Sequence, residues 1–250
     1  MLINSFLIPD EYLNKIGTGL YLSTSKLDHC CAPNCVYTYN GTEQIIRALT
    51  YIEQPSPDKM FVTYIDNAMP SWERRLQLNE NYYFYCQCSW CVDEAKHIDR
   101  LMTSVKCPNS WCFGFSGITK DDTGQTQLLS CSGCGKTDFP VEYAREIVRL
   151  VREMAKGACI ELKLWQKAVE YGELAWTQKI KCVPHPSPSL GLQLFEQGKL
   201  LTNTGNIDKA WEIFLKAANI LQITHGTENN MYLELEDLIE QCEIVLDLPV

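Results

Sequence analysis

Apolar and polar residues alternate in two different ways along the chain, and the change falls near residues 139–140. Before it, runs of β-branched and aromatic residues flank Asn40 and Gly41, a dipeptide typical of tight turns, which predicts a β-hairpin. The run MFVTYI at 60–65 predicts a further strand. Pro70 and the residues after it predict a short helix that ends before the next cysteines.

After residue 140 the apolar positions follow helical spacing. Intervals of three and four residues separate Val141, Ala144, Val148, Val151 and Ala155. This spacing puts them on one face of an amphipathic helix, and Gly157 is a suitable stop.

Further along, small and bulky residues follow the spacing of a tetratricopeptide helix pair, with small residues where two helices touch. They are Gly198, Leu201, Gly205, Ala210, Phe214 and Ala217. Ala168 and Ala175 repeat the spacing between Ala210 and Ala217. This indicates a second, less regular helix pair before the first one. An ordinary helical bundle is the alternative interpretation.

The totals narrow the class of protein. With 250 residues and 46% hydrophobic content, the chain can form a core or two small domains. It shows no signal-peptide pattern and no apolar run of about 18 residues, so an intracellular location without a membrane span is expected. A net charge of -9 disfavours direct nucleic-acid binding, which needs basic residues against phosphates, and suits a basic protein or peptide partner.

Thirteen cysteines cluster at short gaps, which in a reducing compartment favours bound metal over disulfides. Cys86, Cys88 and Cys91 form a C-x-C-x2-C group with three of the four thiolates that structural zinc requires. The missing ligand is expected in the stretch DHCCAPNC, residues 28–35, which contains Cys30, Cys31 and Cys35.

A second set is complete by itself and predicts a small zinc ribbon whose polar loop needs the metal to fold. Its members are Cys107, Cys112, Cys131 and Cys134. The other cysteines, Cys159, Cys182 and Cys242, are interpreted as small apolar side chains.

Histidine suggests a competing chemistry. His29 stands beside two cysteines, an arrangement that could pair a thiol nucleophile with its base. Catalytic Cys/His pairs usually come from distant positions, so a cysteine hydrolase is disfavoured. His97, His185 and His225 lie in polar or linker stretches and are expected at the surface.

Four motifs in order then resemble one family. They are GTGLYLSTSKLDHCCAPNC, NGTEQIIRAL, TYIDNAMPSWERRLQL and FYCQCSWC. Together they are similar to the SET and MYND domain (SMYD) protein lysine methyltransferases. The resemblance covers the carboxyl-terminal half of the SET domain, the post-SET cysteines and the helical tail.

The resemblance implies roles for individual residues. Cys31 would be the fourth ligand of the first zinc ion. The second zinc ion, predicted from spacing, would be held by the Cys107 to Cys134 set. Tyr64 would be the active-site tyrosine, and Tyr82 would form a wall of the lysine channel. S-adenosylmethionine would be contacted by Asn4, Asp28, His29 and Phe84. Two departures are Asp28, where the family has asparagine, and Cys30, where it has serine.

The fold implied is α+β, the carboxyl-terminal half of a SET domain with a post-SET zinc site and a zinc-ribbon insertion, followed by an all-α tetratricopeptide-like domain. The expected boundaries are 1–80 for the SET part, 81–95 for the post-SET cluster, 96–139 for the ribbon and 140–250 for the helices. The pattern begins inside the SET domain, without the family's glycine-rich loop or MYND finger, so a shortened chain is expected.

The function implied is S-adenosylmethionine-dependent methylation of lysine in a histone tail or another protein, in the cytoplasm and nucleus. The helical tail is a candidate surface for a peptide or protein partner. The alternative is a catalytically inactive interaction protein in which zinc holds the scaffold together and the tail binds partners.

Overall fold

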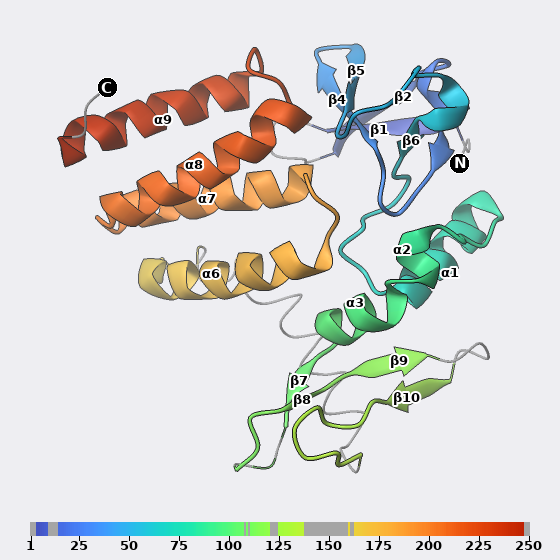
Figure 1. The fold of residues 1–250 in the computed structure, drawn as a ribbon. Coiled ribbons are helices and arrows are strands. Elements are labelled where there is room, and N and C mark those ends of the chain that lie inside the picture. The colour runs from blue at the N-terminus through green and yellow to red at the C-terminus, as the bar shows by residue number, and fades with distance from the viewer. Residues whose placement is uncertain are drawn as a thin grey trace. The chain divides into compact units, whose positions relative to one another are not determined.

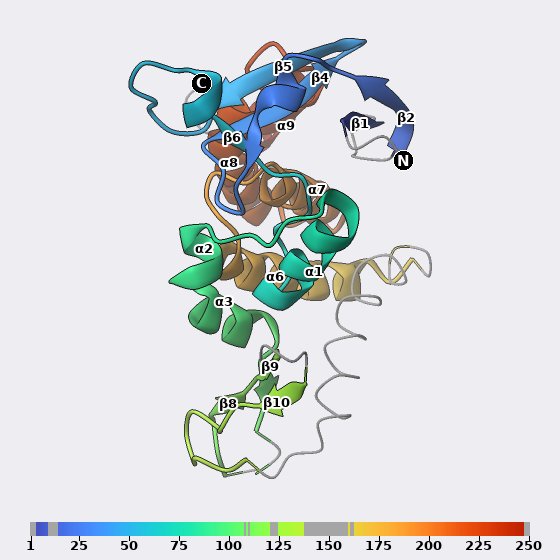
Figure 2. The same ribbon diagram turned by 90° about the vertical axis from the view of Figure 1, so that its right-hand side faces the viewer.

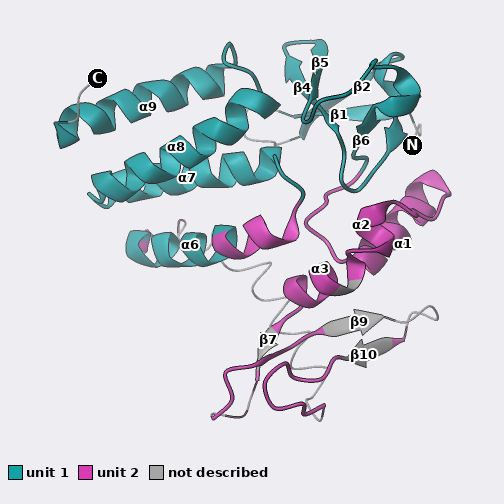
Figure 3. Cartoon of the chain, viewed as in Figure 1, with its two compact units in different colours: residues 1–64, 165–176, 184–250 teal, residues 65–164, 177–183 magenta. Residues whose placement is uncertain are grey.

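The computed structural model describes residues 4–9, 15–107, 109, 111–120, 125–137, 160 and 163–247. The chain is a mixed α and β protein (Figure 1). It divides into two compact units, which Figure 3 colours separately. The first contains 1–64, 165–176 and 184–250, and the second contains 65–164 and 177–183.

The first unit begins with pairs of short strands. β1 (Ser5–Pro9) and β2 (Lys15–Leu20) are antiparallel, as are β4 (Cys35–Asn40) and β5 (Glu43–Ala48). β3 (Asp28–His29) and β6 (Phe61–Val62) run parallel. Two 3-10 turns, Thr24–Lys26 and Pro57–Lys59, lie between these strands.

The predicted hairpin is confirmed in β4 and β5. Asn40 pairs with Glu43, so the turn residues are Gly41 and Thr42. Gly41 has φ 57°, a left-handed conformation that glycine adopts without steric cost. The hairpin packs on a small core of Leu27, Cys35 and Val62.

The first unit is completed by helices, seen in Figure 1 and from the side in Figure 2. α7 (Pro188–Asn203), α8 (Ile207–Thr224) and α9 (Asn230–Leu246) follow the amino-terminal part of α6 (Trp165–Cys182). α8 packs against both α7 and α9, and it also contacts the β4–β5 hairpin.

Helices α7 and α8 pack closely where Gly198 faces Phe214. A Cβ atom at Gly198 would lie 2.2 Å from Cε1 of Phe214, so these helices can approach this closely because residue 198 has no side chain. Ala210, Phe214 and Ala217 are fully buried along the same face of α8. Gly198 and Phe214, two of the positions predicted from spacing, therefore form a contact between α7 and α8.

The second unit begins with α1 (Ser71–Tyr82), α2 (Ser89–Val92) and α3 (Ala95–Met102). Two antiparallel strand pairs follow, β7 (Val105–Lys106) with β8 (Phe115–Ser116), and β9 (Ile118–Lys120) with β10 (Thr126–Leu128). The predicted short helix is confirmed as α1, which ends at Tyr83 in a left-handed conformation, φ 62°.

Three other expectations have different outcomes. The strand expected at 60–65 is shorter, because the backbone N–H of Tyr64 donates to a side chain instead of a neighbouring strand. The helix expected at 141–155 and the boundary at 139–140 lie outside the described residues.

The expectation that His225 is a surface residue is wrong. Only 8% of His225 is exposed, because the end of α8 packs beside Arg47 of β5. Burial, with a contribution from Arg47, lowers the pKa of His225 to about 4, and its Nδ1 lies 2.8 Å from the Thr224 hydroxyl. His97 and His185 are exposed as expected.

Candidate metal centres and active-site residues

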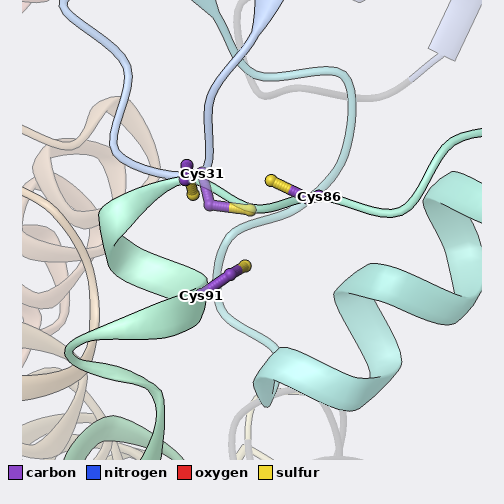
Figure 4. Close-up of side chains that lie close together, drawn as sticks. Cys31, Cys86 and Cys91 are labelled. Carbon is purple, nitrogen blue, oxygen red and sulfur yellow. The ribbon is translucent and has the colours of Figure 1, made fainter.

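The structure brings four cysteines together in a first group, Cys31, Cys86, Cys88 and Cys91. Their sulfur atoms all lie within 4.8 Å of one another. Figure 4 shows the side chains of Cys31, Cys86 and Cys91 directed toward one another. Tetrahedral zinc with Zn–S bonds of 2.3 Å needs sulfur atoms about 3.8 Å apart, so the group fits a zinc ion.

The C-x-C-x2-C segment is held in place from α1. The Arg75 guanidinium donates to the carbonyl oxygens of Cys86 and Cys91, at 3.0 and 2.9 Å. The backbone N–H of Cys91 donates to the carbonyl of Cys88 in the first turn of α2. These bonds fix the backbone that carries three of the four thiols.

A fully buried arginine lies against the same group. Arg74 has no exposed surface, donates to the carbonyl of Met69 at 2.5 Å, and places Nη2 3.5 Å from Sγ of Cys91. A guanidinium stays charged in proteins, so burying it favours a negative partner nearby. The Asp99 carboxylate is one such partner. Thiolates bound to zinc would supply further negative charge beside Cys91, which is consistent with a metal at this group.

The amino terminus of α1 is tied to α3 by Asp99. The backbone N–H of Ser71 donates to Oδ1 of Asp99 at 2.6 Å, and the Ser71 hydroxyl donates to Oδ2. Burial raises the pKa of Asp99, while the bonds from Ser71 and the charge of Arg74 oppose that rise. Asp99 therefore anchors the helix that carries Arg74 and Arg75.

The second group, Cys107, Cys112, Cys131 and Cys134, meets the same test. Sγ of Cys107 lies 3.8 Å from Sγ of Cys134, and Sγ of Cys112 lies 3.7 Å from Sγ of Cys131. A disulfide would require about 2.05 Å, whereas the sulfur edge of a tetrahedral zinc site is about 3.8 Å. The spacing matches metal ligation.

Two glycines make this second group possible. A Cβ at Gly114 would lie 2.4 Å from the backbone nitrogen of Gly133, and one at Gly133 would lie 2.9 Å from Sγ of Cys112. Their N–H groups donate to the sulfurs of Cys112 and Cys131, at 3.3 and 3.4 Å. Backbone N–H groups of Cys134 and Gly133 lower the pKa of Cys131 to about 6, which favours its thiolate.

The loop between β3 and β4 is held by Asn34, which the sequence analysis did not single out. Its amide donates to the carbonyl of Lys59 at 2.7 Å, and its Oδ1 accepts from the N–H of Phe61 at 2.8 Å. The carbonyl of Asn34 also accepts from Leu49. Asn34 thus connects the cysteine loop to β6, and a turn-forming asparagine inside a cysteine cluster was the available signal.

Tyr64 and His29 are in direct contact within the first unit. The N–H of Tyr64 donates to Nδ1 of His29 at 3.1 Å, and the Tyr64 hydroxyl donates to the carbonyl of Leu27 at 2.5 Å. The two rings lie 5.3 Å apart between centroids. Nε2 of His29 lies 3.2 Å from Sγ of Cys31. The half-buried Tyr64 is therefore held at both its backbone and its hydroxyl.

The other predicted site residues have distinct environments. Asn4 and Asp28 are exposed in the first unit, and Asp28 pairs with Phe61 across the β3–β6 ladder. Tyr82 and Phe84 are half-buried residues of the second unit. Burial raises the pKa of Tyr82, so its phenol keeps its proton near neutrality.

Comparison with known proteins identifies relatives of the chain. No family model matches the chain. The human histone-lysine N-methyltransferase SMYD3 is 30% identical over 250 residues, which cover 97% of this chain and 57% of SMYD3. This similarity supports membership of the SET and MYND domain family for the part of the chain that is aligned. The four sequence motifs agree with this similarity.

Other relatives extend the comparison. The N-lysine methyltransferase SMYD2 of Mus musculus is 25% identical, with 95% of this chain and 58% of SMYD2 covered. The histone-lysine N-methyltransferase ASHR1 of Arabidopsis thaliana is also 25% identical, with 96% of this chain and 58% of ASHR1 covered. The chain therefore spans a little over half the length of these relatives.

Proposed function

We propose that this chain is part of an S-adenosylmethionine-dependent protein lysine N-methyltransferase of the SET and MYND type. The observation that carries the proposal is the fixed position of Tyr64. Its N–H donates to His29 and its hydroxyl donates to the carbonyl of Leu27, beside the loop that carries Cys31. The relatives SMYD3, SMYD2 and ASHR1 are named as lysine methyltransferases. The substrate would be a lysine in a histone tail or in another protein.

The residues present suit the cofactor. S-adenosylmethionine would supply the methyl group as an electrophilic sulfonium. The exposed carboxylate of Asp28 can accept a hydrogen bond from the cofactor's ammonium, and Asn4 and Phe84 would complete the binding residues. Because both ring nitrogens of His29 already have partners, its contact would come from the ring face or the backbone.

The chain's own residues would contribute alignment. Methyl transfer to an amine is an in-line displacement, so the rate depends on holding the two reactants in one geometry. The fixed hydroxyl of Tyr64 would orient the lysine nitrogen through its remaining lone pair. The neutral phenol of Tyr82 would form part of an aromatic wall, which also favours a methylammonium by about 0.5–2 kcal/mol.

The substrate lysine must lose a proton before it reacts. Its free pKa is about 10.4, so the charged form dominates near neutrality. An apolar channel disfavours the ammonium and shifts the lysine toward the neutral amine. The two zinc ions proposed for the cysteine groups would be structural, since each group supplies four thiols and leaves no open position.

A substitution at Tyr64 tests this function. In the protein that carries this chain, Tyr64→Phe should lower transfer of labelled methyl groups to histone and other lysine-containing proteins by on the order of 10²-fold or more. Zinc content should stay unchanged. Tyr51→Phe, at a tyrosine that is 91% exposed, is the matched control and should leave transfer unchanged.

The function would be refuted if the unsubstituted protein, with both zinc ions and the cofactor present, transferred no methyl group to lysine in any of these proteins. Retention of the full rate by Tyr64→Phe would refute the role of that hydroxyl while leaving the reaction class in place. These two outcomes are distinguishable because the first concerns the unsubstituted protein.

A protein-binding role for the helices is the second candidate. α9 leaves Leu233, Ile244 and Val245 exposed, which are apolar side chains of the kind that partner proteins cover. The tetratricopeptide-like interpretation of α7 and α8 belongs to this candidate. Binding of a protein partner that Ile244→Lys abolishes, in a protein without methyl transfer, would favour it. A cytoplasmic and nuclear location is proposed for either function.

A further inference from the structure

Each ring nitrogen of His29 takes part in one hydrogen bond. Nδ1 accepts from the backbone N–H of Tyr64 at 3.1 Å, and Nε2 lies 3.2 Å from Sγ of Cys31. One imidazole therefore lies between the proposed active-site tyrosine and a thiol of the first cysteine group.

The tautomer follows from the first of these bonds. A backbone N–H is always a donor, so Nδ1 must carry a lone pair and no proton. A neutral imidazole then has its proton on Nε2. Nε2 therefore donates toward Cys31, and the sulfur accepts, which suits a thiolate better than a thiol.

A thiolate at Cys31 is the form that binds zinc. Imidazole N–H donation to a metal-bound sulfur would spread its negative charge and fix its direction, and outer-shell partners of this kind usually contribute 10–100-fold in metal affinity. The same ring fixes the amide of Tyr64. Any shift of the Cys31 loop would move the ring and disturb the Tyr64 backbone.

We propose that His29 is a positioning residue that couples the first cysteine group to Tyr64. It would hold the Cys31 sulfur in its ligating direction with one nitrogen and the Tyr64 backbone with the other. The catalytic meaning of the Tyr64 bond rests on the proposed function, whereas the effect on zinc does not.

Two substitutions separate the two bonds. His29→Asn places an amide oxygen near the position of Nδ1 and leaves nothing at Nε2. His29→Gln places an amide nitrogen near the position of Nε2 and leaves nothing at Nδ1. Each variant thus keeps one bond and removes the other, and His97→Asn and His97→Gln are matched controls at an exposed histidine.

Two readouts follow the two bonds in the zinc-loaded protein. The equilibrium constant for zinc transfer to a chromogenic chelator should rise about 10–100-fold at one of the two sites in His29→Asn. In His29→Gln it should stay near the value of the unsubstituted protein. Hydrogen exchange of the Tyr64 amide should accelerate about tenfold in His29→Gln and stay slow in His29→Asn. The zinc of the Cys107 to Cys134 group is an internal reference and should not change.

A third measurement needs no substitution. Nitrogen chemical shifts of the His29 ring in the unsubstituted protein should show a proton on Nε2 and none on Nδ1. The opposite tautomer would overturn the proposal even if both variants failed to fold. Equal effects of Asn and Gln on both readouts would also overturn it, because they would show general damage to the loop.

Failure of methyl transfer is a separate result. If the ring tautomer and the split between Asn and Gln are as expected but no methyl group is transferred, His29 couples zinc to Tyr64 and the proposed reaction is wrong. If transfer is present and the split is absent, the reaction stands and the coupling is wrong.

Discussion

At the scale of single residues, two neighbouring cysteines have different roles. Cys31 is fully buried and joins the first group of thiols, whereas Cys35 packs against Leu27 and Val62 and burial raises its thiol pKa. Cys31→Ser should therefore release one of the two zinc ions. Cys35→Ser should keep both and lower the free energy of unfolding by about 1–3 kcal/mol, because a hydroxyl enters an apolar core.

Elemental analysis and thermal melting of the two variants check this prediction. Loss of zinc from Cys35→Ser with retention in Cys31→Ser would reverse the assignment. Cys30 is the further comparison, because its Sγ lies 3.3 Å from the carbonyl of Ala32 and it is outside both groups. Cys30→Ser should leave the metal content at two ions.

Arg74 is a second test at this scale. Its buried guanidinium donates hydrogen bonds to the carbonyls of Met69 and Trp90 and to Sγ of Cys91. Arg74→Met would remove these bonds and the positive charge next to the thiols. We expect the free energy of unfolding to fall by about 3 kcal/mol and zinc to be lost more readily to a chelator. Arg74→Lys keeps the charge without the planar fork and should lie between the two. Denaturant unfolding at fixed zinc measures the series, and equal stability of Met and Arg would contradict it.

At the scale of elements, local chemistry explains what could be predicted. The β4–β5 hairpin and α1 depend on signals within a few residues, a turn glycine and a helix start after Pro70, and both appear as expected. The parallel pair β3–β6 does not depend on local signals. It depends on Asn34 bridging to Lys59 and Phe61, contacts across 25 and 27 positions that no local pattern encodes.

The same distinction applies to the candidate sites. Cysteine spacing predicted seven of the eight cysteines that the structure gathers into two groups, and the family resemblance predicted the eighth, Cys31. The buried Arg74 and the bonds of His29 were not predicted, because an arginine in a helix and a histidine in a loop are usually exposed. His225 was mistaken for a surface residue for the same reason, since its burial depends on the contact between α8 and β5.

The zinc ribbon provides a prediction about an element. Gly114→Ala would place a methyl group 2.4 Å from the Gly133 backbone nitrogen and 2.7 Å from Sγ of Cys131. Backbone atoms cannot rotate away, so we expect a loss of about 1–3 kcal/mol in ribbon stability and weaker binding of the second zinc ion. Gly17→Ala in β2, where nothing lies within 4 Å, is the control. Chelator competition would contradict the prediction if both variants behaved alike.

At the scale of the whole molecule, the two cysteine groups should have unequal importance for the rest of the chain. The described helices α7, α8 and α9 have an apolar core of their own, which includes Phe195, Phe214 and Leu221. None of the helices in the described part of the chain is long and apolar enough to cross a membrane. The helical packing needs no metal in any contact that the structure describes.

The described ribbon differs, because its buried cluster consists of Cys107, Cys112 and Cys131 and its strands are two or three residues long. We therefore expect metal binding to supply most of its folding free energy. The purified chain should carry two zinc ions, and a strong chelator should make 105–107, 111–120 and 125–137 exchange hydrogen freely while α7–α9 remain protected. Hydrogen exchange read by segment, with and without chelator, measures this. Uniform loss of protection, or a ribbon that stays protected without metal, would show that zinc does not act locally on this element.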